Sequence, residues 1–173
     1  MYSQKPIQSG TIDAAILSGL SAEAPEERLR ALERLESLIN SERMSGEEAI
    51  PYLLHALRDD EKEIRNTATL LLGLIGEDAL SELSRFLNDS SWVVRYRVCE
   101  ALSLMKVPAA YPHLQTALSD GKDHVRYMAA KGLGLLGISS AVSDLTVLLN
   151  DENPYVRAMA QNAIDSISGT PTS

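Results

Sequence analysis

The sequence predicts an all-α fold, an α-solenoid of about five helix pairs, and three observations predict it. First, an aspartate followed six residues later by an arginine recurs at Asp59, Asp89, Asp120 and Asp151. Second, apolar or small residues follow each of these arginines at three, seven and ten positions, which is one stripe of an α-helix and not of a strand. Third, a shorter segment with alanine first and leucine at the fifth and ninth places precedes each aspartate. Self-similarity at about 30 residues is typical of stacked repeats.

The first helix pair is a degenerate copy of the pattern. Its short helix is marked by Ile12, Ile16 and Leu20, and its long helix by Arg28, Ala31, Leu35 and Leu38 at the matching positions. A polar loop, NSERMSGEE, follows and lengthens the distance to the next pair. We therefore predict a helical domain over residues 11–167, with disordered tails at 1–10 and 168–173.

The other four pairs repeat one plan. Their short helices begin at Ala49, Ala79, Ala110 and Ala141, and their long helices follow the four aspartates. Gly76 and Gly137 stand where a long helix is expected to end, and glycine is the usual residue for a left-handed helix C-terminus. Ordering one pair costs roughly 1–2 kcal/mol per residue. About eight apolar side chains return only about 1.5–3 kcal/mol each, so each pair must stack on its neighbours to be stable.

Composition narrows the function classes. The formal net charge is −8, which argues against a nucleic-acid partner because such binding requires Lys and Arg to neutralise phosphates. No apolar run approaches the roughly 18–20 residues of a membrane span, so no membrane partner is expected. The first ten residues contain no apolar signal core, and we expect a cytoplasmic protein. The single cysteine, Cys99, excludes an internal disulfide.

The repeated aspartates and arginines are interpreted as a structural ladder. An aspartate at a helix start can cap free N–H groups, and an arginine one turn later can bridge to the turn of the neighbouring repeat. A residue type present in every repeat supports stacking, which every repeat needs, in preference to catalysis. The ladder residues are Asp59, Arg65, Asp89, Arg95, Asp120, Arg126, Asp151 and Arg157.

This pattern of Asp, five residues, Arg, then Ala and Leu with a closing Leu-Gly resembles the short HEAT-like repeat of the phycobilisome lyases, over about residues 11–167. The resemblance implies longer helices lining a concave side that binds partners. Its most specific implication is the small subunit of an E/F-type phycobilin lyase, active only with a partner subunit. Such a subunit helps attach a bilin to a phycobiliprotein cysteine, together with a longer HEAT-like subunit, and holds the bilin transiently. The alternative is a non-enzymatic scaffold for protein–protein interaction.

A second relative of this repeat, deoxyhypusine hydroxylase, can be tested on the residues. The resemblance would require His-Glu pairs immediately after repeat arginines, where that family binds two irons. Here the residues after the arginines include Asn66-Thr67 and Tyr127-Met128, and no His-Glu pair is among them. No metal site is predicted, and His55, His113 and His124 are interpreted as surface or capping residues.

A candidate binding surface follows from helical geometry. At about 100° per residue, the predicted core positions cluster on one side of each long helix, and the opposite side is centred one, five and eight positions after the arginine. Tyr96 and Tyr127 should then be neighbours, with Glu100 beside Lys131 and Trp92 on the same side. The predicted concave-face binding residues are Trp92, Tyr96, Cys99, Glu100, Tyr127 and Lys131. Exposed Trp and Tyr are typical of interface hot spots.

Alternatives remain for several of these residues. Trp92 can instead cover the turn between helices, and Tyr52, Tyr111 and Tyr155 are interpreted as packing residues. Cys99 is interpreted as a small, half-buried helix residue, with a chemical role as the lesser alternative. The lyase resemblance implies that the aromatic residues stack on a tetrapyrrole and that Lys131 is available to a propionate. No catalytic residue is named by the sequence.

Overall fold

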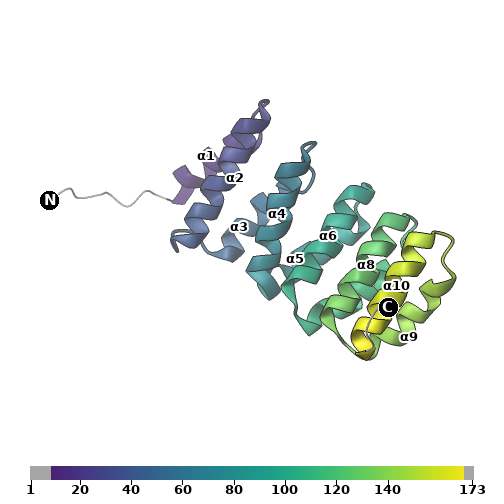
Figure 1. Ribbon diagram of the computed structural model, residues 1–173. Coiled ribbons are helices and arrows are strands. Elements are labelled where there is room, and N and C mark those ends of the chain that lie inside the picture. The colour runs from purple at the N-terminus through teal and green to yellow at the C-terminus, as the bar shows by residue number, and fades with distance from the viewer. Residues whose placement is uncertain (1–8, 170–173) are drawn as a thin grey trace. The chain divides into compact units, whose positions relative to one another are not determined.

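The computed structural model describes residues 9–169, and this part of the chain contains helices and no strands (Figure 1). The predicted all-α solenoid of five helix pairs is confirmed. The α-helices are α1 (Ser9–Leu20), α2 (Pro25–Asn40), α3 (Gly46–Ala56), α4 (Lys62–Ile75), α5 (Leu80–Arg85), α6 (Trp92–Met105), α7 (Tyr111–Ala117), α8 (Asp123–Leu136), α9 (Ala141–Val147) and α10 (Pro154–Ser168). Short 3₁₀ turns at Gly76–Ala79, Phe86–Asn88, Pro108–Ala110 and Leu148–Asn150 flank the first helices of the last three pairs.

The chain divides into two compact units, residues 1–68 and 69–173, and each is described by itself. In the first unit α1 packs against α2 and α3. The side chains of Ile16, Leu32, Leu35 and Leu53 are fully buried there. The degenerate first copy is therefore a complete helix pair, with its apolar residues in the positions that the repeat predicts.

In the second unit the long helices α6, α8 and α10 lie side by side, and the shorter helices α7 and α9 pack against them (Figure 1). Val98, Leu102 and Leu133, from the predicted helical stripe, are fully buried. The long helices approach closely because small residues lie between them. A Cβ added to Gly134 would come within 2.9 Å of the Cβ of Ala163 on the next long helix.

The ends of the long helices follow the glycine prediction at two places. Gly76 and Gly137 have φ of +77° and +67°, so both adopt the left-handed conformation that favours glycine. Helix α6 ends instead on Lys106, with φ of 54°, because its segment has no glycine at this position. A lysine in this conformation is uncommon, since its Cβ crowds the backbone.

The helical part is slightly longer than predicted. Helix α1 begins at Ser9 and α10 ends at Ser168, whereas the prediction placed the domain at residues 11–167. The rest of the two predicted tails, apart from Gly169, lies outside the described residues. Within residues 9–169, no helix combines the length and the apolar character needed to cross a bilayer.

Candidate functional site

The ladder of the second unit is built from forked ion pairs. The Nε of Arg95 lies 2.7 Å from Oδ2 of Asp120, and its Nη2 lies 2.9 Å from Oδ1. Arg126 binds Asp151 with the same two contacts, at 2.7 and 2.9 Å. In both arginines Nη1 donates to the carbonyl of the aspartate six residues earlier, in the turn before its own helix. Each guanidinium thus joins two consecutive turns with its planar donor geometry.

The first unit contains one more pair of this kind, which the sequence did not assign to the ladder. Arg28, in the degenerate first copy, binds Asp59 with Nε at 2.6 Å and Nη2 at 3.0 Å. Arg65 donates from Nη1 to the carbonyl oxygens of Asp59 and Asp60. The signal for Arg28 was present, because it occupies the same repeat position as the predicted arginines.

The aspartates do not cap their helices directly, which corrects the expected role. The carboxylates of Asp89, Asp120 and Asp151 each accept from the backbone N–H two residues later. Those later residues, and not the aspartates, are the N-caps of α6, α8 and α10. The aspartates therefore fix the turn before the helix. The hydrogen bonds that Asp151 accepts, chiefly from Arg126, hold the pKa of its carboxyl below the usual range.

Arg157 differs from the other ladder arginines. Its Nη1 donates to the carbonyls of Asp151 and Glu152, as in the other repeats. Its side chain is exposed, and among residues 9–169 no carboxylate binds its remaining donors. Arg126 and Arg157 therefore occupy the same repeat position, but Arg126 is buried in an ion pair whereas Arg157 is exposed to solvent.

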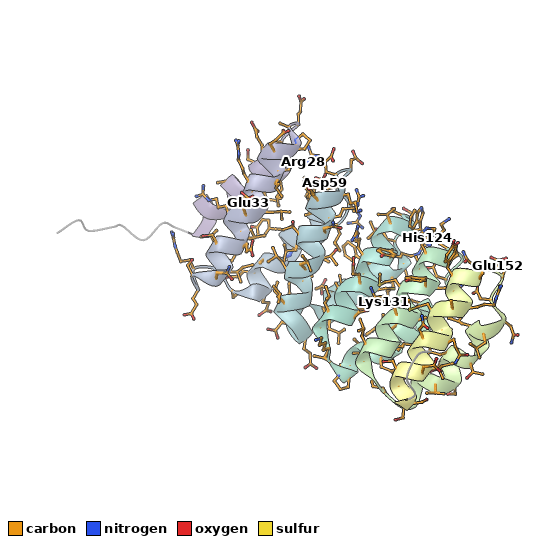
Figure 2. The ribbon with its side chains drawn as sticks, viewed as in Figure 1. Arg28, Glu33, Asp59, His124, Lys131 and Glu152 are labelled. Carbon is orange, nitrogen blue, oxygen red and sulfur yellow. The ribbon has the colours of Figure 1, made fainter. Side chains whose placement is uncertain are left out.

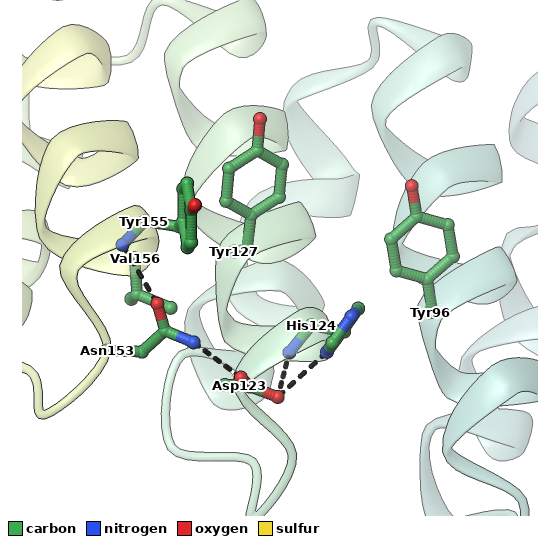
Figure 3. A pocket seen from close by; sticks show the side chains of 7 residues that line it. All are labelled: Tyr96, Asp123, His124, Tyr127, Asn153, Tyr155 and Val156. Carbon is green, nitrogen blue, oxygen red and sulfur yellow. Dashed lines mark hydrogen bonds and ion pairs between the residues drawn. The ribbon is translucent and has the colours of Figure 1, made fainter.

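A cavity of about 290 Å³ is lined by residues from α6 and from the N-terminal ends of α8 and α10. We call it the tyrosine pocket (Figure 3). Its lining residues are Tyr96, Asp123, His124, Tyr127, Asn153, Tyr155 and Val156. Figure 3 shows the rings of Tyr96 and Tyr127 projecting in the same direction from neighbouring helices, with both hydroxyl groups pointing away from Asp123. The structure thus places these two predicted residues together.

A hydrogen-bonded group forms the polar side of the tyrosine pocket. Asp123 Oδ1 accepts from the backbone N–H of His124 at 2.9 Å and lies 2.8 Å from the Nδ1 of its ring. Asp123 Oδ2 accepts from the side-chain amide of Asn153, whose Oδ1 in turn accepts from the N–H of Tyr155 at 2.8 Å. The hydrogen bonds from His124 and Asn153 hold the pKa of Asp123 well below its usual range. The carboxylate is ionised and already satisfied.

Tyr155 was interpreted as a packing residue, and the structure corrects this. Its side chain is 75% exposed and forms one wall of the tyrosine pocket. His124, interpreted as a surface or capping residue, is exposed and lines the same pocket. Both residues lie two positions before a ladder arginine, so their shared repeat position is the signal that would have found them.

Trp92 takes the alternative role of covering a turn. Its ring lies 5.0 Å from that of His124, and the Nζ of Lys122 lies 5.3 Å from its centre. Both partners belong to the turn and first residues that start α8. Trp92 is not among the residues lining the tyrosine pocket, although 38% of its surface is exposed.

Cys99 does not belong to the binding surface, contrary to the prediction. Its side chain is fully buried, and burial raises the pKa of its thiol far above the usual range. The prediction was wrong because the side of α6 that carries Cys99 is packed and not solvated. A buried, protonated thiol is a poor nucleophile.

The expected arrangement of Glu100 beside Lys131 is replaced by a pair within α6. Glu100 accepts from Nη1 of Arg97 at 2.6 Å, and the Arg97 side chain is only 11% exposed. Lys131 is exposed part-way along α8 (Figure 2) and forms no ion pair within the described part of the chain. Burial raises the pKa of Tyr96, and the neighbouring carboxylate of Glu100 raises it further.

A row of exposed leucines is the largest feature that the sequence reasoning missed. Leu74, Leu104 and Leu135 are 81%, 39% and 55% exposed on α4, α6 and α8. All three lie nine positions after a ladder arginine, whereas the prediction used the position eight residues after it. That position is packed: a Cβ added to Gly73 would lie 2.6 Å from the Cβ of Leu104. The exposed side therefore includes the predicted positions one and five after the arginine, as at Tyr127 and Lys131, but it continues to position nine and not to position eight.

These residues define one surface of the second unit, which we call the long-helix face. It consists of the exposed or half-exposed side chains Leu70, Leu74, Tyr96, Leu104, Tyr127, Lys131 and Leu135. Along α8 the members of the face are Tyr127, Lys131 and Leu135, which are spaced four positions apart. Among residues 9–169, no three His, Cys, Asp or Glu side chains converge as metal ligands would.

Comparison with solved structures shows the same fold in several different proteins. The chain matches human deoxyhypusine hydroxylase in complex with glycerol at 22% identity and a TM-score of 0.59, over 92% of this chain and 63% of that one. It matches the complex of CpcE and CpcF of phycocyanin lyase from Nostoc sp. PCC7120 at 21% identity and a TM-score of 0.61, over 98% and 69%. It matches Cex1p at 18% identity and a TM-score of 0.62, over 95% and 36%. The chain thus spans less than two thirds of the hydroxylase.

The family is shown by a sequence model. No curated protein matches the chain. The model of HEAT repeats matches residues 50–125 and 112–173, which together make up most of the sequence. These matches cover the four aspartate–arginine repeats and the helix pairs observed in the structure. The chain therefore belongs to the HEAT-repeat family.

Proposed function

We propose that this protein is a binding module that holds a protein partner on its long-helix face. The observation that supports this is the placement of exposed apolar side chains. Of the eight large hydrophobic residues exposed in the described part, six lie on the second, longer helices of the pairs, and four of these belong to the long-helix face: Leu70, Leu74, Leu104 and Leu135. Contiguous exposed apolar surface on a folded protein marks an interaction site.

The rigidity of the second unit supports the same proposal. The Arg95–Asp120 and Arg126–Asp151 bridges fix the register of consecutive repeats. The leucines and tyrosines are therefore held at set spacings before any partner arrives. A preorganised surface loses less conformational entropy on binding, so more of its apolar burial appears as affinity.

The test compares two variants of matched chemistry. Leu74→Ser with Leu135→Ser removes exposed apolar side chains from the long-helix face. Val147→Ser removes one from α9, where Val147 is 74% exposed and not part of that face. A photo-crosslinking residue in place of Lys131 captures the bound protein from a lysate of the native cells. We expect capture by the wild type and by Val147→Ser, and about a tenfold loss in the leucine variant.

Two results would contradict the proposal. Equal capture by the leucine variant would show that the partner binds elsewhere. A loss of helical circular dichroism in that variant would show that the leucines are structural. Because both leucines are exposed, we expect the helical content to be unchanged.

A second candidate is a subunit of a phycobilin lyase, which one observation favours. The fold likeness to the phycocyanin lyase complex extends over 98% of this chain. In this candidate a bilin binds transiently across the tyrosine pocket, with Tyr96 and Tyr127 stacking on it and Lys131 binding a propionate. A longer HEAT-like subunit and a phycobiliprotein subunit are the partners. The buried Cys99 takes no part, since the accepting cysteine belongs to the phycobiliprotein.

This candidate has its own test. The cavity of about 290 Å³ lies at the lower end of the size of ligand pockets, so a tetrapyrrole would extend beyond it along the face. The protein is mixed with a bilin and with a longer HEAT-like lyase subunit, and the visible absorbance is recorded. A shifted absorbance band that Tyr127→Ala removes is expected. An unchanged spectrum in the complete mixture would rule out this candidate and leave the binding module in place.

A further inference from the structure

We infer that the tyrosine pocket receives a proline-rich, extended segment of the protein partner, an inference that rests on the proposed function and names the partner's chemistry. The first step concerns charge. Asp123 is the one acidic residue lining the pocket, and its oxygens already accept from His124 and Asn153. Lys122 also lies 3.5 Å from Oδ1 of Asp123. The carboxylate therefore has little left to offer a cation.

An anionic occupant is not favoured either. Lys131, the exposed lysine of the long-helix face, does not line the pocket, and Lys122 stands over Trp92 and beside Asp123. His124 shares its ring Nδ1 with Asp123. The ionisable groups at the pocket are thus paired with one another. A neutral occupant complements this site because it leaves no buried charge without a partner.

The walls specify the shape and polarity of that occupant. Tyr96, Tyr127 and Tyr155 supply aromatic surfaces. The hydroxyl groups of Tyr96 and Tyr127 point away from the Asp123 carboxylate (Figure 3). The pocket therefore offers flat apolar walls together with hydroxyl donors. A prolyl residue matches both properties, because its ring is apolar, its carbonyl accepts, and it has no N–H that would need an acceptor.

The repeat spacing matches the same ligand. Tyr96 and Tyr127 occupy the same repeat position on the adjacent helices α6 and α8. Packed helices lie about 8–10 Å apart. A polyproline II segment has three residues per turn and rises about 3.1 Å per residue, so it presents the same side every ~9 Å. Such a segment running across the long helices would place one residue against Tyr96 and the third residue after it against Tyr127. Aromatic-lined grooves bind proline-rich segments in this way.

The experiment uses the full chain and a defined probe, acetyl-decaproline-amide, with a Gly-Ser decapeptide of equal length as the comparison peptide. Binding is followed by NMR shifts of the tyrosine rings. We expect saturable binding of decaproline with shifts at Tyr96, Tyr127 and Tyr155. Tyr155→Ala should weaken it about tenfold, since hot-spot aromatic residues have effects of this size, and Tyr127→Phe, which removes only a hydroxyl, should weaken it less. Val147→Ala is the matched control, because Val147 is 74% exposed on α9, and it should bind as the wild type does.

Several results would overturn the inference. They are the absence of saturable decaproline binding at millimolar concentration, equal binding of the Gly-Ser peptide, and unchanged affinity in Tyr155→Ala with its helical content intact. Tighter binding of acetyl-arginine-amide than of decaproline would show a cation site instead. Failure of the proposed function is recognised by a different experiment. In that case the Leu74→Ser, Leu135→Ser variant captures the partner as well as the wild type does, whether or not decaproline binds.

Discussion

Two sets of side chains occupy fixed repeat positions in several repeats of this molecule, and they behave in opposite ways. In the ladder, an arginine of one repeat meets an aspartate of the next, so each bridge is complete within the chain. On the long-helix face, equivalent positions of neighbouring helices carry the same residue type, as with Tyr96 and Tyr127, which line one pocket, and with the exposed Leu104 and Leu135. Two tyrosines or two leucines on neighbouring helices do not satisfy one another as an arginine and an aspartate do. Their exposed surfaces remain available to a partner.

The comparison teaches how a repeat separates stability from binding. Complementary residue types at two positions form contacts that close between repeats. One residue type repeated at a single exposed position forms a surface that remains open to a partner. We therefore expect changes in the ladder to lower the free energy of unfolding, and changes on the face to lower binding alone.

The largest expected effect is that of Arg126→Ala. It leaves the Asp151 carboxylate, which is only 6% exposed, without its forked partner. Removing one member of a largely buried pair should lower the free energy of unfolding by about 2–3 kcal/mol, measured by urea denaturation. The control is Arg157→Ala, whose exposed side chain lacks a carboxylate partner among the described residues and should cost less than about 1 kcal/mol. An equal loss of unfolding free energy in the two variants would show that the carboxylate partner of Arg126 does not contribute to stability.

The next effect concerns Cys99, which lies on the packed side of α6 and not on the long-helix face. Cys99→Ser places a hydroxyl group in a fully buried position and should lower the free energy of unfolding by about 1–3 kcal/mol. Because burial raises the pKa of the thiol, a disulfide reagent should label the wild type only when urea is present. Rapid labelling of the native protein would place Cys99 back on the accessible surface.

A smaller effect is expected from acid, which acts on the ladder and not on the face. Burial alone would raise the pKa of Asp120, but the hydrogen bonds from Arg95 and from the N–H of Lys122 outweigh it, and the pKa is lowered. The pKa of Asp151 is lowered as well, chiefly by Arg126. An unfolded aspartate titrates near pH ~3.9. The stabilisation by these carboxylates is therefore complete above that pH and is lost as the pH falls through their lower folded values.

This acid effect can be measured as the melting temperature between pH 6 and pH 3. The melting temperature should fall below about pH 4 in the wild type. In Asp151→Asn the starting value should be lower and the further fall smaller, since one titrating carboxylate is absent. A variant with the same acid-dependent fall as the wild type would show that Asp151 does not contribute.

The smallest expected effect on stability comes from the exposed side chains of the long-helix face and of the tyrosine pocket beside it. Leu135→Ser and Tyr155→Ala alter side chains that are 55% and 75% exposed. Each should change the free energy of unfolding by less than about 0.5 kcal/mol. A loss as large as that of Arg126→Ala would show that the face stabilises the fold, and the separation of stability from binding would fail.

The sequence alone determined the repeat, its five helix pairs and the buried stripe, because these depend on local periodicity. Leu102 and Leu133 are buried where the pattern predicts. Gly76 and Gly137 end their helices as predicted, because the left-handed backbone conformation at a helix end depends on the residue at that position. The neighbouring positions of Tyr96 and Tyr127 were also predictable, since repeats that stack in register bring equivalent residues together.

Only the tertiary structure decided where the exposed side of each long helix begins and ends. A rotation of about 100° per residue fixes the angles between side chains on one helix. The directions in which the neighbouring helices lie are set by packing between repeats. Packing turned Gly73 toward Leu104 and buried Cys99, and it left Leu135 and Tyr155 exposed. Those directions depend on contacts between residues about 30 positions apart, so the pattern within a single helix does not contain them.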